Sequence, residues 1–136
     1  DKTIENITKL TINDIFSKYG ENYFRKIEKE VAVDLLKKNN SIISLGGGSI
    51  LDSNVRKYIK KNSFSVYLKV DLGTLTERLK NSKKRPLLTN VDIKKKLIEL
   101  YEERKNFYKE SDLIIQNNNN VNEIISLLKL KLKENE

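Results

Sequence analysis

"SIISLGGG", residues 41–48, joins a short apolar run to three consecutive glycines. A run of this length, bounded by turn-forming residues, predicts a buried strand over 41–45. In open parallel sheets, ligands lie beyond the carboxyl ends of the strands, which is where these glycines would be. Gly46, Gly47 and Gly48 would then offer backbone amides to a small polar ligand, with no side chains in the way. A tight turn that requires positive φ is the alternative explanation.

The rest of the chain alternates between helical and strand patterns. The predicted helices cover 3–18 (one helix or two short ones, capped by Thr11 or Asn13), 20–40, 52–61, 71–81, 91–110 and 121–134. The predicted strands cover 41–45, 64–70 and 112–116, and residues 82–90 form a polar loop. Strand and helix in alternation predict an α/β fold with a parallel sheet and right-handed crossovers, in a single domain that spans 1–136.

Composition limits the chemistry available to the chain. The sequence has no Cys and no His, which excludes disulfides, thiolate metal sites, a Cys nucleophile and a His base. No apolar run is long enough to predict a membrane span. The absence of Met indicates that the chain begins inside a longer reading frame.

The basic residues favour an anionic partner. The net charge is +8, and all but five of the 27 basic residues are Lys. Where Arg is used in place of Lys, its flat fork of donors suits bidentate contact with a carboxylate or phosphate. A solvated surface of lysines is the alternative for most of the charge. The five arginines are Arg25, Arg56, Arg78, Arg85 and Arg104.

No phosphate-binding loop is found in these 136 residues. "GGGS" lacks the spacing of a Walker A loop and has no Lys after it, and it is not GxGxxG either. Arg85 lies in the basic loop "KKRPLL", which Pro86 stiffens and which resembles a lid over phosphates. Arg25 and Arg104 each lie in a predicted helix; a surface charge is the alternative for Arg25, and an ordinary charge pair on a solvated face is the alternative for Arg104.

Five short segments, taken in order, resemble the shikimate kinase family. They are "DKTIE" (1–5), "GENYFR" (20–25), "LGGGS" (45–49), "KRPLL" (84–88) and "RKNFY" (104–108). The resemblance implies a three-layer P-loop kinase fold with five parallel strands in the order 2-3-1-4-5, of which this chain would contain strands 3, 4 and 5 without the first two. It also implies transfer of a phosphoryl group from ATP, with Mg²⁺, to the 3-hydroxyl of shikimate.

The same resemblance assigns roles to residues. Asp1 matches an aspartate that contacts the shikimate hydroxyls and acts as base, and the glycines match a substrate loop. Arg25 and Arg104 match the pair that grips the shikimate carboxylate. Arg85, in the lid of about 82–90, matches a contact to the ATP phosphates, and Arg78 matches a contact to adenine. The Walker A loop and the metal ligands would lie upstream of Asp1, with no metal ligand in this chain.

Several further expectations follow from these assignments. The 136 residues alone are predicted to fold poorly and to be inactive, because the central strand would be missing. The complete protein is expected to be a cytoplasmic monomer that binds no membrane. It is also expected to bind no nucleic acid, since its few aromatic residues fall mostly in helical core positions. Another small P-loop kinase, such as a gluconate kinase, and a non-catalytic homologue are the alternatives.

Overall fold

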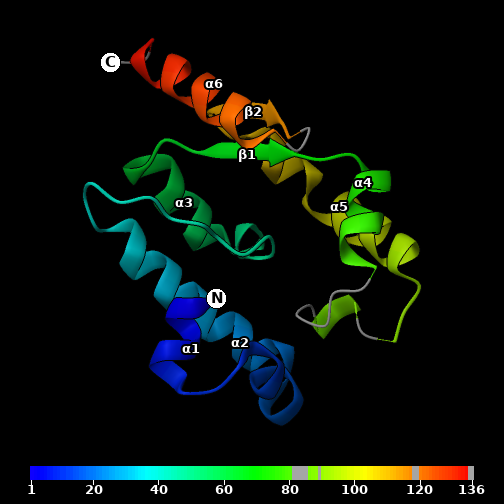
Figure 1. The fold of residues 1–136 in the computed structure, drawn as a ribbon. Helices are drawn as coiled ribbons and strands as arrows, with labels where there is room; N and C mark the ends of the chain where they lie inside the picture. Colours follow the sequence, from blue (N-terminus) through cyan, green and yellow to red (C-terminus); the bar gives the residue numbers. More distant parts are fainter. Residues whose placement is uncertain (81–85, 89, 118–119, 135–136) are drawn as a thin grey trace.

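The computed structural model describes residues 1–80, 86–88, 90–117 and 120–134. Its elements in chain order are α1 (Lys2–Thr8), α2 (Ile12–Leu36), the 3₁₀ turn η1 (Ser49–Leu51), α3 (Ser53–Asn62), β1 (Val66–Lys69), α4 (Leu72–Leu79), the 3₁₀ turn η2 (Pro86–Leu88), α5 (Ile93–Lys109), β2 (Leu113–Gln116) and α6 (Val121–Lys133) (Figure 1). Among the described helices, none is long and apolar enough to cross a bilayer.

The amino-terminal third is a helical layer whose boundaries follow local signals. Thr11 caps α2 in a reciprocal pair: its hydroxyl accepts from the Asp14 N–H at 3.1 Å, and the Asp14 carboxylate accepts from the Thr11 N–H at 3.4 Å. Gly20 interrupts α2 with a positive φ of 79°, a conformation that suits glycine. Thr11 is thus confirmed as an N-cap, and the predicted break before residue 20 is a kink inside one long helix.

The strand predicted over 41–45 is not formed. Residues 41–46 have no regular structure, although Ile43 and Leu45 pack against the buried cluster of Ala32, Leu36 and Val55. Strand assignment requires a hydrogen-bonded neighbour, and both described strands pair with each other instead. The apolar pattern correctly predicted the packing of this segment, but an extended chain without a ladder partner is not a strand.

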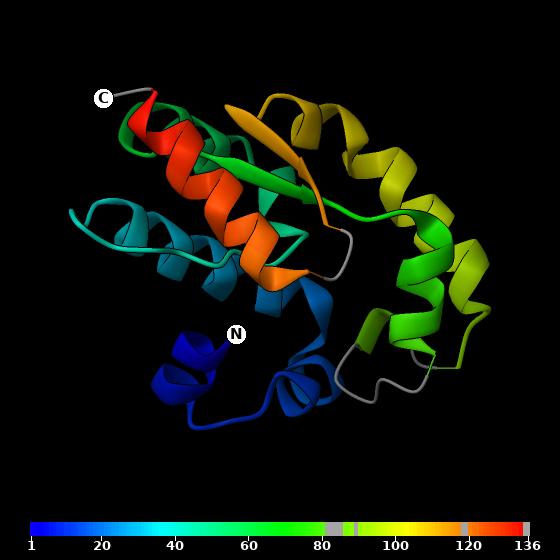
Figure 2. The ribbon, with the colours of Figure 1, turned by 45° about the horizontal axis from the view of Figure 1, so that its top comes forward.

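The two later strands are confirmed and are parallel. β1 pairs with β2 in a register that runs from Val66 opposite Leu113 to Lys69 opposite Gln116. In the two ribbon views, α6 lies on one side of this pair, and α3 and α5 lie on the other (Figures 1 and 2). Since β2 is the partner of β1 within the described part of the chain, the other edge of β1 is unpaired, as expected.

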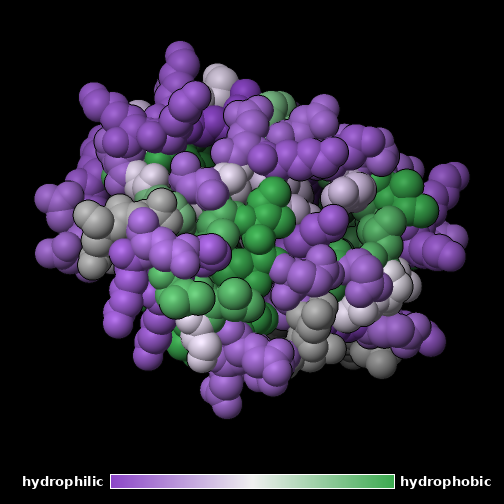
Figure 3. Space-filling view, turned by 90° about the horizontal axis from the view of Figure 1, so that it is seen from above, coloured by the Kyte–Doolittle hydropathy of each residue, from purple (hydrophilic) through white to green (hydrophobic). Residues whose placement is uncertain are grey.

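One face of the molecule carries exposed apolar side chains. Seen from above, apolar side chains gather at the centre of a face with a polar rim (Figure 3). On the strands and α6, seven large apolar residues are 43% exposed or more, and the register places two of them, Leu68 and Ile114, on opposite sides of the strand pair: Leu68, Ile114, Val121, Ile125, Leu127, Leu130 and Leu132. Apolar side chains that gather on an exposed face, as in Figure 3, favour association with another surface.

Candidate active site

A cavity of about 310 Å³ lies between α2, the glycine segment, β1 and α5. Asp1, Arg25, Arg104 and the three glycines line it together, although they are spread over more than a hundred positions of sequence. Aromatic and aliphatic side chains complete its wall, among them Phe16 and Phe24, whose rings lie 4.7 Å apart. Six of the eight residues assigned by resemblance are thus brought to one cavity.

The glycines are required here for space and not for backbone conformation. Among the described glycines, only Gly20 has a positive φ, so the tight-turn alternative for 46–48 is wrong. A Cβ on Gly46 would overlap the Glu28 carboxylate, and a Cβ on Gly48 would overlap the Arg25 guanidinium. The triple glycine therefore lets the backbone pass directly against an ion pair from α2.

That ion pair holds Arg25 in place. Its Nη1 donates to the Glu28 carboxylate at 2.5 Å, and its Nε and Nη2 donate to Glu21 at 3.2 and 3.1 Å. Glu28 is buried, with 6% of its surface exposed. Burial alone would lower the pKa of Arg25, but the two carboxylates outweigh it and raise that pKa above its ordinary value. Three of the five guanidinium N–H donors are thereby engaged, which leaves two for a ligand.

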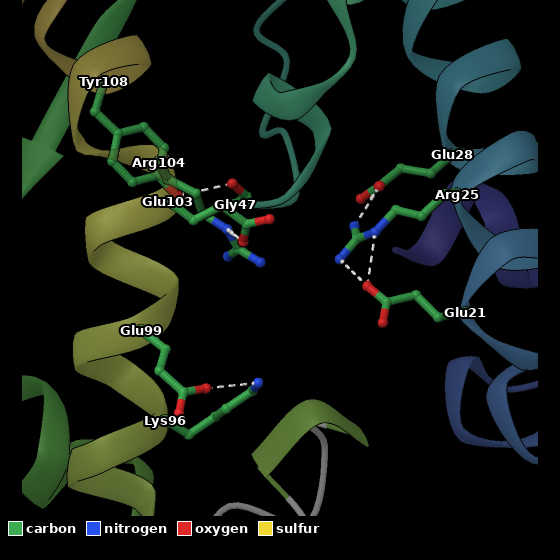
Figure 4. A network of polar contacts seen from close by, with 9 residues as sticks. All are labelled: Glu21, Arg25, Glu28, Gly47, Lys96, Glu99, Glu103, Arg104 and Tyr108. Atoms are coloured by element: carbon green, nitrogen blue, oxygen red, sulfur yellow. Dashed lines mark hydrogen bonds and ion pairs between the residues drawn. The ribbon is translucent and has the colours of Figure 1, made fainter.

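Arg104 faces the cavity from the opposite side. Figure 4 shows Arg25 on α2 and Arg104 on α5 pointing toward the same space. The Arg104 side chain is only 12% exposed, and its buried Nε has no hydrogen-bond partner within the described part of the protein. The nearest carboxylate, that of Glu103, lies at 3.9 Å, which is too far for a hydrogen bond. A buried charged donor without an acceptor is costly, so this site favours an anionic ligand.

Asp1 reaches the cavity from the start of α1. It is the N-cap residue of α1, yet its side chain accepts no hydrogen bond from the helix amides. Its carboxylate is exposed and lines the same cavity as the two arginines. An uncommitted acceptor in this position can accept hydrogen bonds from ligand hydroxyls.

Two polar residues of this cavity, Glu28 and Tyr108, were given no role from the sequence, although Tyr108 ends the segment "RKNFY". Glu28 lies three residues after Arg25, and Tyr108 lies four residues after Arg104, so each shares a helix face with an arginine. Helical spacing was the available signal for both. That spacing alone does not show that Glu28 and Tyr108 face a cavity, because burial is not visible in the sequence.

Of the two residues assigned to the nucleotide, Arg78 is described by the structure and Arg85 is not. Arg78 is exposed in the last turn of α4 and does not line the cavity. Arg85 lies outside the described residues, as does most of the predicted lid. The part of the lid that is described, Pro86 to Leu88, forms a 3₁₀ turn that lines the cavity and buries Leu88. Within the described ranges, no group of three or more acidic residues is placed to hold a metal ion.

Comparison with known proteins decides the family. The sequence model of the family described as shikimate kinase matches residues 1–133. The chain belongs to the shikimate kinase family. It is 36% identical over 115 residues to the shikimate kinase of Bartonella henselae, and 42% identical over 106 residues to that of Xylella fastidiosa (strain M23). These matches cover 85% and 77% of this chain, but only 55% and 59% of the two relatives.

Solved structures of the family share this fold. The shikimate kinase of Acinetobacter baumannii, in complex with shikimate, matches with a TM-score of 0.92 at 31% identity and covers 98% of this chain and 76% of that one. The enzyme of Aquifex aeolicus matches with a TM-score of 0.84 at 33% identity, over 99% of this chain and 79% of that one. The predicted α/β P-loop kinase fold is thereby confirmed.

Proposed function

We propose that the protein phosphorylates the 3-hydroxyl of shikimate, with ATP as donor. One observation carries this proposal beyond family membership. Arg25 and Arg104 converge on one cavity, and the buried Nε of Arg104 has no hydrogen-bond partner among the described residues. A small rigid acid whose carboxylate accepts from both arginines would be held in one orientation. Phosphoryl transfer depends mainly on such positioning and on charge stabilisation, and needs neither His nor Cys.

The remaining cavity residues fit the other end of this acceptor. Asp1 is an acceptor for ring hydroxyls, and it would take the proton from the attacking one. Gly46 to Gly48 would let the substrate lie against the backbone, because no side chain intervenes. The apolar wall around Phe24 would reduce the access of water to the reacting groups.

The donor side of the reaction rests on fewer residues. ATP supplies the transferred group, and Mg²⁺ neutralises charge on its phosphates when bound. Of the described residues, only Arg78 is proposed to contact the nucleotide, and Arg85 would contact the phosphates. The described carboxylates do not form a magnesium site, so no step is assigned to the metal. A monomeric state and a cytoplasmic location belong to the same proposal, and light scattering and cell fractionation would test them.

The first test is a substrate panel on the full-length protein. We expect ATP-dependent phosphorylation of shikimate and not of gluconate, measured as ADP release. Phosphorylation of gluconate alone would favour another small kinase. Failure to phosphorylate either acid, by a protein that binds ATP, would contradict the proposal and favour a non-catalytic homologue.

Arg104→Lys provides the sharper test. Lysine keeps the charge but loses the two-pronged contact, so the KM for shikimate should rise roughly tenfold to a hundredfold, while the KM for ATP changes little. Arg78→Lys is the matched variant, and it should instead raise the KM for ATP. Equal effects of Arg104→Lys on both substrates would contradict the assignment of Arg104 to the acceptor.

A further inference from the structure

Tyr108 connects α5 to the glycine segment. Its hydroxyl donates to the Gly47 carbonyl oxygen at 2.7 Å, across 61 positions of sequence (Figure 4). Its ring stacks on Tyr67 of β1, with centroids 4.9 Å apart and planes inclined by 21°. The stack limits how the ring can move, so the hydroxyl is held in a fixed place against the backbone of the loop.

The contact with Gly47 is close enough to determine where the loop lies. A Cβ built on Gly47 would be 3.0 Å from the Tyr108 hydroxyl and 3.5 Å from Nη1 of Arg104. The loop therefore packs directly on the helix face that carries Arg104. Because a peptide unit is planar and trans, holding the Gly47 carbonyl toward Tyr108 turns the Gly48 N–H the opposite way. One hydroxyl thus orients an amide of the proposed substrate loop.

A second anchor holds the end of the same segment. Nη1 of Arg56 donates to the carbonyl oxygens of Ile50 and Leu51, both at 2.8 Å. The Arg56 guanidinium also lies 4.0 Å from the ring centroid of Phe107, which precedes Tyr108 on α5. The segment from Gly47 to Leu51 is therefore attached to one helix turn at both of its ends.

We propose that Tyr108 is a positioning residue of the acceptor site, with Arg56 as the second anchor. Through its bond to Gly47, Tyr108 holds the glycine loop at a fixed distance from Arg104. The carboxylate-binding arginine and the loop amides then act on one acceptor molecule as a preformed unit. This proposal rests on the proposed function, since it concerns the same acceptor.

The test is Tyr108→Phe in the full-length protein, which removes the hydroxyl and keeps the ring stack. We expect the KM for shikimate to rise about twofold to tenfold, with kcat and the KM for ATP unchanged, as for loss of one hydrogen bond. Amide hydrogen exchange at Gly47 to Ser49 should become faster. Tyr58→Phe, which removes a hydroxyl outside the cavity, is the matched control. It should change neither the KM for shikimate nor the exchange rate of the loop amides.

Exchange at the loop separates this inference from the proposed function. Unchanged exchange in Tyr108→Phe overturns the inference, whatever the kinetics. Faster exchange with an unchanged shikimate KM overturns it too, because the loop would then move without effect on the acceptor. If the parent protein does not use shikimate, the proposed function fails. The part of the inference that concerns acceptor binding then fails as well, whereas the part that concerns the hold of Tyr108 on the loop is still decided by the exchange rates. Should Tyr108→Phe not fold, Arg56→Lys is expected to give the same changes in exchange and KM.

Discussion

At the scale of single residues, space and not backbone conformation explains the triple glycine. Gly46 and Gly48 lie where any Cβ would overlap Glu28 or Arg25. Gly47 is exposed, but it approaches Tyr108 and Arg104 from the other side. Each glycine thus brings the backbone against a different polar side chain of the cavity, and substitutions should differ in their effects by position.

Gly48→Ala should therefore weaken acceptor binding more than Gly47→Ala. The Cβ at Gly48 would displace the Arg25 guanidinium from Glu28, whereas the Cβ at Gly47 would lie 3.0 Å from the Tyr108 hydroxyl, a tight contact that a small shift relieves. We expect the KM for shikimate to rise roughly tenfold or more for Gly48→Ala, as for loss of a charged hydrogen bond, with the KM for ATP little changed. Steady-state kinetics would check whether the KM for shikimate rises more in Gly48→Ala than in Gly47→Ala.

Gly73→Ala on α4 is the control for this comparison. There a Cβ would meet only the Asp71 carboxylate, at 3.2 Å, and Gly73 itself does not line the cavity. It should leave both KM values unchanged. A larger effect of either loop variant on the KM for ATP than on that for shikimate would contradict the acceptor role of the loop.

At the scale of elements, short polar contacts connect segments that the sequence separates. Asp52 caps α3 by accepting from the N–H groups of Asn54 and Val55, and it also pairs with Lys29 of α2 at 3.1 Å. Asp112 ties the start of β2 to the residue before β1: its carboxylate accepts from the Ser65 N–H at 2.7 Å and from the Ser65 hydroxyl at 2.6 Å. These contacts place the glycine segment and the strand pair relative to α2 and α5.

The Asp112 contact predicts acid sensitivity of the strand pair. Hydrogen bonds from the Ser65 hydroxyl and amide lower the pKa of Asp112 below its ordinary value. Because the pKa of Asp112 is lower in the folded chain, its ionised carboxylate stabilises the fold at pH values above its pKa in the unfolded chain, about 3.9. This stabilisation is lost as the pH falls through the pKa of Asp112 in the folded chain. Urea unfolding between pH 7 and pH 3 should show this loss.

Asp112→Asn provides the comparison, because the amide cannot titrate. The difference in unfolding midpoint between parent and Asp112→Asn should be largest near pH 7 and should shrink toward pH 3. A difference that stays constant over this range would show that Asp112 does not contribute through its charge.

The sequence predicted more of the elements than of the site. The cap at Thr11 and the regular apolar spacing placed most helices within a few residues, because these signals are local. The strand at 41–45 was predicted wrongly, since strand formation depends on a neighbour that periodicity cannot supply. Motif resemblance predicted the cavity arginines, but the burial of Glu28 and the bond from Tyr108 to Gly47 arise only from packing between distant segments.

At the scale of the whole molecule, the exposed apolar face limits stability. Leu68, Ile114 and several apolar residues of α6 remain in contact with water, so their burial does not contribute to folding. The unpaired edge of β1 adds backbone groups that can pair with another chain. The 136 residues by themselves should therefore be marginally stable and prone to self-association.

Light scattering and denaturant unfolding of the 136-residue chain would test this expectation. We predict oligomers at micromolar concentration and a free energy of unfolding below about 5 kcal/mol, the lower end for folded domains. Leu130→Lys, at a position that is 56% exposed on α6, should reduce the association without lowering stability. A monomer that unfolds in one cooperative transition, with a free energy of unfolding well above that value, would contradict the prediction.

The glutamates around Arg25 also have a thermodynamic consequence. A free arginine side chain loses rotamer freedom when it clamps a ligand, at a cost of about 0.5–1.5 kcal/mol. Here Glu21 and Glu28 immobilise the guanidinium when the chain folds, before any ligand arrives. The entropy of capturing a carboxylate should thus be less unfavourable than for a mobile arginine. Calorimetry of Glu21→Gln should reveal this contribution as a less favourable binding entropy, even where the heat of binding is preserved.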